Sequence, residues 1–221
     1  MIILFNDIIQ KSDAPLSLKT PALAETANTN GSLTISLEEE TQISAIGIGN
    51  TDGEEFEVAF NDAENTKFSF QFKENGLYPM KAPVFASFIT IQTDANFIGR
   101  FAAGLGVKIP TAIAKQPGWH STSEPRTSLS GQILPGAGGY NYRTLSLDSR
   151  YKLGPDAVRE LVTGYKQIGE GFPFFINFDT EHYKLPYQFF YATEQNQRAW
   201  ALEGGIRRFL YSYRFNFTEA F

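Results

Sequence analysis

Hydrophobic and polar residues alternate along much of this chain, and the alternation is clearest in its last thirteen residues, 209–221, FLYSYRFNFTEAF. One side of an extended strand there would carry Tyr211, Tyr213, Phe215 and Phe217, and the other Ser212, Arg214, Asn216 and Thr218. A period of two predicts a strand with one packed face and one solvated face. Because untethered termini fray, we expect this strand to be tied into a sheet.

The same pattern recurs in short segments through the first half of the chain. Strands are expected at residues 33–37, 43–48, 56–60, 67–72, 88–92 and 97–101. The dipeptides Asn30-Gly31, Asp52-Gly53 and Asn75-Gly76 accept positive φ and are typical of tight hairpin turns. Short strands with turns between them predict an antiparallel, jelly-roll-like β-sandwich over residues 1–102.

Residues 103–221 are expected to form a second β-rich domain with one helix. Residues 103–130 show little periodicity and predict a connector with a long loop, and residues 131–139 predict another loop. Strands are expected at 140–151, 172–178 and 188–193 and at the end of the chain. Apolar residues spaced three and four apart after Pro155 predict an amphipathic helix over about 155–168 that lies across one sheet face.

Composition excludes several classes of protein. A chain of 221 residues can bury a stable core without disulfides or structural metals. The absence of cysteine excludes disulfides and thiolate metal sites. The net charge of −5, with Arg207-Arg208 as the densest basic spot, argues against a nucleic-acid partner. Residues 1–17 lack a charged first region and are interrupted by Asn6 and Asp7. They predict a first strand, not a signal peptide or membrane span, and synthesis in a cytoplasm without a cleaved leader.

No constellation of residues predicts catalysis, a cofactor or a metal. His120 and His182 lie in separate segments and supply few ligands. No serine occupies a nucleophile elbow, and Asp179, Glu181 and Glu194 show no motif that would hold two carboxyls across a cleft. We therefore expect a protein that is not an enzyme.

Two further stretches have simple structural interpretations. The glycine-rich residues 47–53 and 136–139 are followed by strand patterns, not by a helix, so they predict turns and not phosphate loops. The three consecutive glutamates at residues 38–40 lack the spacing of a calcium loop and predict a solvated edge.

One set of aromatic residues remains as a candidate binding surface. They lie in or beside predicted loops and are Trp119, Tyr140, Tyr142 and Trp200. Tyr and Trp stack on sugars and also anchor protein–protein interfaces. Both uses stay open from the sequence, and interface or core use is favoured.

Several segments resemble components of tailed bacteriophages. The stretch ISAIGIGNTDGEEFEVAF at 43–60 resembles the galactose-binding, discoidin-like sandwich modules of phage tail proteins. The second half of the chain resembles phage minor tail or baseplate components. The segments that carry this resemblance are TSLSGQ at 127–132, LSLDSRYK at 145–152, PFFINFD at 173–179, QFFYAT at 188–193 and the aromatic terminal strand.

This resemblance implies a structural protein of the virion tail or its distal tip, assembled in the host cytoplasm. Its expected partners are other tail proteins and further copies of itself, in a ring or cluster that links the tail tube to fibres. The alternative is a carbohydrate-binding, lectin-like module that recognises a glycan on the host surface. Neither function requires nucleic acid, a membrane or a cofactor.

Overall fold

A computed structural model describes residues 2–20, 24–73, 75–108, 112–121, 126–127, 133–134, 141–149, 155–168, 173–177, 189–194, 201–205, 208–212 and 214–220. The chain is mainly β, and its strands form antiparallel sheets as the sequence predicts. Within the described ranges, α2 (Pro155–Ile168) is the one helix longer than a single turn, and its bounds confirm the predicted helix over about 155–168.

A six-stranded sheet of order β2-β7-β3-β6-β4-β5 contains most of the first half of the chain. Its strands are β2 (Ala27–Asn28), β3 (Ser32–Thr51), β4 (Glu55–Phe60), β5 (Lys67–Gln71), β6 (Gly76–Thr93) and β7 (Phe97–Gly104). The predicted strands at 33–37 and 43–48 are two parts of the single long strand β3.

The strands β3 and β6 fold this sheet into a sandwich. The first part of β3 pairs with the end of β6, and its last part pairs with both the start of β6 and β7. Register shifts between Ser36 and Thr41 and between Ile43 and Ala45 mark the bends. Because bulges bend strands, the two halves of one sheet face each other. Buried side chains from both halves, such as Ile35, Val58 and Phe101, belong to one core cluster.

The three predicted hairpin turns do not join neighbouring strands, so that expectation was wrong. Asn30-Gly31 has positive φ at both residues and closes a turn through the amide of Ser32 and the carbonyl of Thr29. It nevertheless joins β2 to β3, and β7 lies between those strands in the sheet. The turns at Asp52-Gly53 and Asn75-Gly76 likewise connect strands that are not adjacent. These turns move the chain between the two halves of the sandwich.

The second large sheet has seven strands in the order β8-β1-β13-β14-β17-β12-β9. It contains β1 (Ile2–Leu4), β8 (Gly106–Lys108), β9 (Ala112–Ser121), β12 (Asn141–Ser149), β13 (Phe174–Asn177), β14 (Phe189–Glu194) and β17 (Arg214–Glu219). The first strand of the chain therefore pairs with β13, which is more than 160 residues away in sequence. A cut near residue 102 falls inside β7, so the predicted domain boundary does not coincide with a boundary between the sheets; the boundary itself stays a prediction.

Two expectations for the second half were wrong. Residues 103–130 were expected to be a connector, but β9 pairs along its length with β12. Pro117 and Gly118 hide the strand in the sequence, and proline is tolerated there because β9 is the edge strand. The terminal alternation was expected to be one strand, but it is divided between β16 (Arg208–Ser212) and β17. The prediction that its end is tied into a sheet is confirmed, because β17 lies between β14 and β12.

The two sheets pack through a small apolar cluster that contains Leu4, Ala45, Leu77, Ala102 and Phe175. The ring of Phe175 on β13 lies where a Cβ at Gly47 of β3 would be, so only glycine allows this approach. Asn177, two residues further along β13, donates from Nδ2 to the carbonyl oxygen of Leu77 at 2.7 Å.

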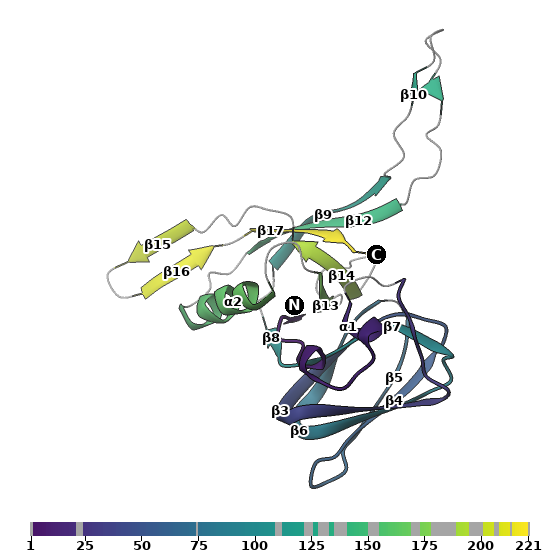
Figure 1. Cartoon of the computed structure of the whole chain (residues 1–221). Helices are drawn as coiled ribbons and strands as arrows, with labels where there is room; N and C mark the ends of the chain where they lie inside the picture. Colours follow the sequence, from purple (N-terminus) through teal and green to yellow (C-terminus); the bar gives the residue numbers. More distant parts are fainter. Residues whose placement is uncertain are drawn as a thin grey trace.

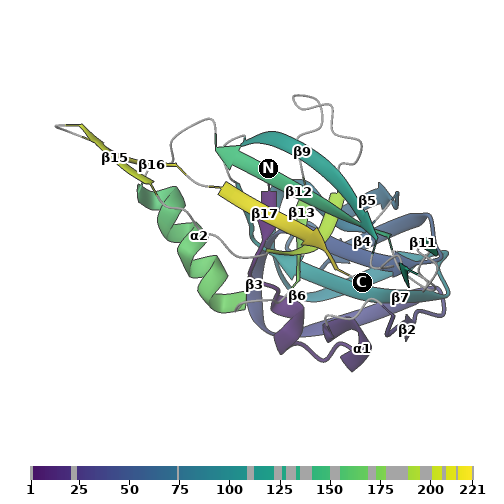
Figure 2. The ribbon, with the colours of Figure 1, turned by 90° about the horizontal axis from the view of Figure 1, so that it is seen from above.

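The opposite face of the seven-stranded sheet packs against the N-terminal segment and α2. The ring of Phe174 contacts those of Phe5 and Phe217 at centroid distances of 5.5 and 6.0 Å. Phe5 in turn lies against Gly164 of α2, where a side chain would collide with its ring. Figure 2 shows the helix alongside the strands of this sheet. The structure thus has the helix on one side of the sheet and the sandwich on the other.

Two ribbons extend beyond this body (Figure 1). One comprises β9 and β12, which lead to the short pair β10 (Arg126–Thr127) and β11 (Ile133–Leu134). The other comprises β15 (Ala201–Gly205) and β16, which pair with each other in a separate two-stranded sheet. The ribbons project in different directions from the seven-stranded sheet.

Candidate functional site

The predicted aromatic residues fall partly within the described structure. Trp119 lies in β9 opposite Arg143, and Tyr142 lies in β12 opposite His120, with its side chain partly exposed. Trp119 and Tyr142 therefore lie on neighbouring strands, but their register positions belong to opposite faces of the sheet, so the pairing does not bring them into one surface. Tyr140 and Trp200 lie outside the described residues, so their proposed role stays a prediction.

A buried ion pair lies at the base of the β9/β12 ribbon. The guanidinium of Arg143 donates from Nε and Nη2 to Oε1 of Glu219 at 2.9 and 2.6 Å, and the Arg143 amide donates to Oε2 at 2.9 Å. Both side chains are more than four-fifths buried. Charge-assisted bonds of this kind hold a defined geometry. The pair therefore fixes β12 to β17 at the point from which the ribbon extends.

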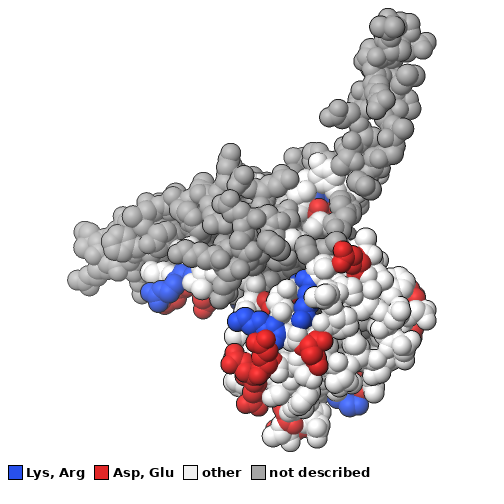
Figure 3. Space-filling view, viewed as in Figure 1, with Lys and Arg blue, Asp and Glu red and all other residues white. Residues whose placement is uncertain are grey.

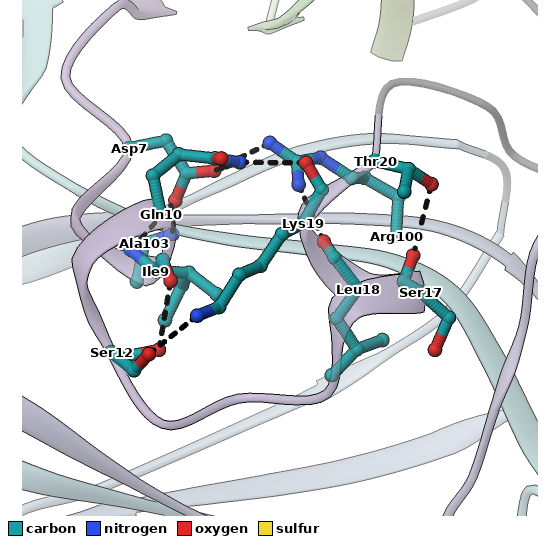
Figure 4. A network of polar contacts seen from close by, with 10 residues as sticks. All are labelled: Asp7, Ile9, Gln10, Ser12, Ser17, Leu18, Lys19, Thr20, Arg100 and Ala103. Atoms are coloured by element: carbon teal, nitrogen blue, oxygen red, sulfur yellow. Dashed lines mark hydrogen bonds and ion pairs between the residues drawn. The ribbon is translucent and has the colours of Figure 1, made fainter.

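A second buried ion pair holds the N-terminal segment on the sandwich (Figure 4). The segment contains the short helices η1 (Ile8–Lys11) and α1 (Leu16–Lys19). Arg100 of β7 donates from Nη2 to Asp7 and from Nη1 to the carbonyl of Leu18, both at 2.5 Å. The amides of Ile9 and Ala103 also donate to Asp7 Oδ1. β1, which precedes this segment, belongs to the seven-stranded sheet. The segment therefore connects the two sheets through the backbone and through the ion pair of Asp7 with Arg100.

The pKa of Asp7 is raised, because its burial outweighs the opposing effect of the Arg100 guanidinium and of the amide donors. A raised carboxyl pKa is often a mark of a catalytic acid. Here both carboxylate oxygens of Asp7 accept hydrogen bonds from the protein itself, and the carboxylate lies between the N-terminal segment and β7. We therefore interpret Asp7 as an anchor that holds the N-terminal segment on the sandwich.

The acidic turns at one end of the sandwich bind each other's backbone. Asp52 accepts hydrogen bonds from the amides of Asn96 and Phe97, and Asp94 accepts from those of Glu54 and Glu55. These bonds, above all that from the Asn96 side chain, lower the pKa of Asp52. Within residues 47–53, the Asn50 amide donates to Oδ1 of Asn75 and the Gly53 amide donates to Oγ1 of Thr51, which agrees with the interpretation of this stretch as a strand end and a turn.

A groove of about 930 Å³ lies between β5 and the bent middle of β6. Apolar side chains, among them Phe68, Met80 and Phe85, line it together with Glu40, Asp62 and Glu64. Phe85 is 53% exposed, which is high for a phenylalanine. The predicted exposure of residues 38–40 is confirmed, and they lie in the bend of β3 opposite this part of β6. Figure 3 shows acidic side chains gathered at one margin of the sandwich.

Neither this groove nor the two buried ion pairs can be predicted from the sequence. Phe85 follows Val84 in a stretch that also contains Pro79 and Pro83, and the sequence does not indicate which of the two hydrophobic residues faces outwards. The partners Asp7 and Arg100 are 93 residues apart, and Arg143 and Glu219 are 76 residues apart. No local spacing rule connects residues at such separations.

Comparisons with known proteins return no match: no protein-family model, curated protein or solved structure is similar to this chain. Among the described residues, no helix has both the length and the apolar character needed to cross a membrane. Within the same residues, no three His, Asp or Glu side chains are grouped as a metal site would require.

Proposed function

We propose that this protein is a structural component of a bacteriophage virion, in the tail or the tail-tip and baseplate region, where it links the tail tube to fibres. One observation carries the part of this proposal that concerns assembly. The ribbon β15/β16 forms a sheet of its own, and β10/β11 lies beyond the ends of β9 and β12. β16 is in contact with α2, and a two-stranded ribbon without further cover is marginally stable in water.

A ribbon gains stability when its strand edges and apolar side chains are covered by another molecule. The apolar residues Leu202, Phe209, Leu210 and Tyr211 in β15/β16 suit such a contact. Assembly into a ring or cluster with copies of this chain and with other tail proteins would cover them. The proposal includes no catalytic step, and the specific place in a virion rests on the resemblance of the sequence segments quoted above.

The test is the solution mass of the purified protein, measured by size-exclusion chromatography with light scattering over a concentration series. We expect discrete multiples of 24.7 kDa. Electron microscopy of those fractions should then show rings or clusters of uniform size. A strict monomer at every concentration, which also fails to bind other tail proteins in a mixed assembly reaction, would contradict the proposal.

The alternative function is glycan binding by a lectin-like module. Its candidate platform is Trp119, which the strand register places beside Arg143 and one residue from His120. If this alternative holds, Trp119→Ala abolishes binding on a glycan array and leaves the solution mass unchanged. Binding that is the same in the variant and in the wild type would exclude Trp119 as the platform.

A further inference from the structure

Charge is divided unevenly along the chain. Residues 1–104, which include the whole six-stranded sheet, contain 14 acidic and 6 basic residues, whereas residues 105–221 contain 10 acidic and 13 basic residues. The formal charges of the two parts at neutral pH are therefore −8 and +3. Surfaces of opposite sign on one molecule favour contacts between neighbouring copies, because the acidic part of one can meet the basic part of the next.

The groove beside β5 is a specific acceptor on the acidic part. Its lining combines exposed apolar surface at Phe85 with the carboxylates of Glu40 and Glu64. Asp62, Lys67 and Lys81 also line the groove. Lys67 forms an ion pair with Glu57 at 2.7 Å, which offsets its charge, so the carboxylates of the lining outnumber the remaining ammonium of Lys81. A partner that fits this groove presents apolar side chains together with positive charge.

The groove also contains an open sheet edge. β5 is the last strand of its sheet and has β4 as its sheet neighbour. The Thr66 carbonyl accepts from the Phe60 amide, and the Phe72 amide donates to the Glu54 carbonyl. Backbone groups alternate in direction along an antiparallel strand, so those of Lys67, Ser69 and Gln71 point away from β4. Residues 66–69 line the groove, so an added strand there gains backbone hydrogen bonds.

The ribbon β15/β16 has the matching composition. Arg208 begins β16 and pairs with Gly205 of β15, and with Arg207 it makes the densest basic spot in the sequence. Apolar residues follow in β16, and the two strands pair with each other in a sheet of their own. β16 contacts α2 of its own chain, and beyond the helix the ribbon projects from the body, where a second molecule can meet it.

We propose that the β15/β16 ribbon of one copy adds to the open edge of β5 in the next copy, with the Arg208 end of β16 near Glu40 and Glu64. This inference rests on the proposed assembly function and specifies its contact. The two surfaces differ, so the contact is heterologous. Repetition of such a contact closes into a ring when the rotation between copies closes, as the proposed function requires.

Cross-linking between copies tests this contact, because the natural chain has no cysteine and gives no background. Two single variants, Ser69→Cys in β5 and Ser212→Cys in β16, are mixed and oxidised mildly. We expect a disulfide-linked species of twice 24.7 kDa that contains one chain of each kind. A disulfide forms only when the two Cα atoms approach within about 7 Å. The control mixture replaces Ser69→Cys by Ser32→Cys, an exposed position outside the groove.

Charge reversal then tests the electrostatic part. In the Ser69→Cys chain, Glu40→Lys with Glu64→Lys should lower the yield of cross-linked species roughly tenfold, since like charges now face each other. A matched control, Glu25→Lys with Glu54→Lys, makes the same charge change at exposed positions outside the groove and should leave the yield unchanged. When the Ser212→Cys chain also carries Arg207→Glu and Arg208→Glu, mixing it with the Ser69→Cys chain that carries Glu40→Lys and Glu64→Lys should restore the yield.

The outcomes separate this inference from the proposed function. Discrete multiples of 24.7 kDa in the wild type, with no more cross-link than in the Ser32→Cys control, would overturn the ribbon contact and leave the assembly function standing. Equal yields from the groove reversal and its matched control would overturn the role of Glu40 and Glu64. A monomeric wild type that gives no specific cross-link would overturn the ribbon contact, and it would contradict the assembly function as well if it also binds no other tail protein.

Discussion

The six-stranded and seven-stranded sheets of this molecule cover their apolar faces in different ways. The six-stranded sheet bends at β3 and β6 and closes over a core formed mostly by its own side chains, to which the N-terminal segment adds Ile9, Ala14 and Leu18. The seven-stranded sheet takes its cover from elsewhere: the sandwich packs on one face, and Phe5 with α2 packs on the other. A sheet that folds over itself supplies most of its own core, whereas an open sheet depends on its neighbours.

The N-terminal segment shows how closely the two regions depend on each other. β1 contributes a strand to the seven-stranded sheet, and a few residues later Asp7 is bound by Arg100 of the six-stranded sheet. The chain therefore crosses between the sheets at its start and again after β7. We expect the seven-stranded sheet to be more sensitive than the sandwich to changes in these connections.

The largest expected effect comes from deletion of residues 209–221. This removes β17, which lies between β14 and β12 and buries Phe217. The seven-stranded sheet would be split, and the exposed strand edges favour aggregation. We expect insoluble protein, measured by fractionation after expression. A soluble truncated chain with a cooperative thermal transition would contradict the dependence of this sheet on its central strand.

The next largest effect concerns the anchor between the sheets. Asp7→Asn leaves the buried guanidinium of Arg100 without its counter-charge, which should lower the free energy of unfolding by about 3 kcal/mol. Urea denaturation measures the change. The control is a double variant, Asp7→Leu with Arg100→Met, which removes both charges and should cost less than Asp7→Leu alone. If the double variant lowers the free energy of unfolding by the sum of the two single changes, Asp7 and Arg100 do not stabilise each other and the pair is not an anchor.

A smaller effect is expected at the contact between the sheets. Gly47→Ala puts a methyl group into the position of the Phe175 ring and should lower the free energy of unfolding by about 2 kcal/mol. Adding Phe175→Leu removes the collision and should recover part of this loss. Thermal or urea unfolding compares the three proteins. An unchanged midpoint in Gly47→Ala would show that the sheets can move apart at little cost.

The smallest effect is expected at the acidic turns of the sandwich. The pKa of Asp52 lies below its ordinary value of 3.8 because the charged form accepts hydrogen bonds from residues 96 and 97. Its stabilising contribution is therefore present above pH 3.8 and is lost as the pH falls through the lowered pKa. Asp52→Asn should destabilise the protein at pH 7 and have less effect at pH 2–3. Urea unfolding at both pH values tests this, and an equal effect at both would contradict the assignment.

Local pattern was sufficient to predict several elements of the fold. The bounds of α2 follow from Pro155 and from apolar residues at helical spacing, β12 follows from alternation, and β13 and β14 follow from short aromatic runs. These patterns reflect which side of an element is buried, and residues three or four apart in sequence carry that information. Where Pro117 and Gly118 interrupt the alternation, as in β9, the strand was missed.

Pairing between distant segments could not be predicted in the same way. Asn30-Gly31 was correctly identified as a turn, but its neighbours pair with other strands because the sandwich places β7 between them. The groove beside Phe85 exists because β6 bends there and β5 ends its sheet. Trp119 and Tyr142 are candidates by residue type alone, and only the pairing of β9 with β12 shows that they lie on neighbouring strands at positions of opposite faces.

The strand-rich character of this chain, its helix and the unequal distribution of charge between its two parts can be derived from the sequence. Those properties depend on residue type and on short-range periodicity. The pairing of β1 with the distant β13, the contact of Asp7 with Arg100 and the projection of two ribbons from the body become visible in the folded chain. The physical reason is that strand partners are chosen by burial and backbone hydrogen bonding over the whole chain, which no local pattern specifies.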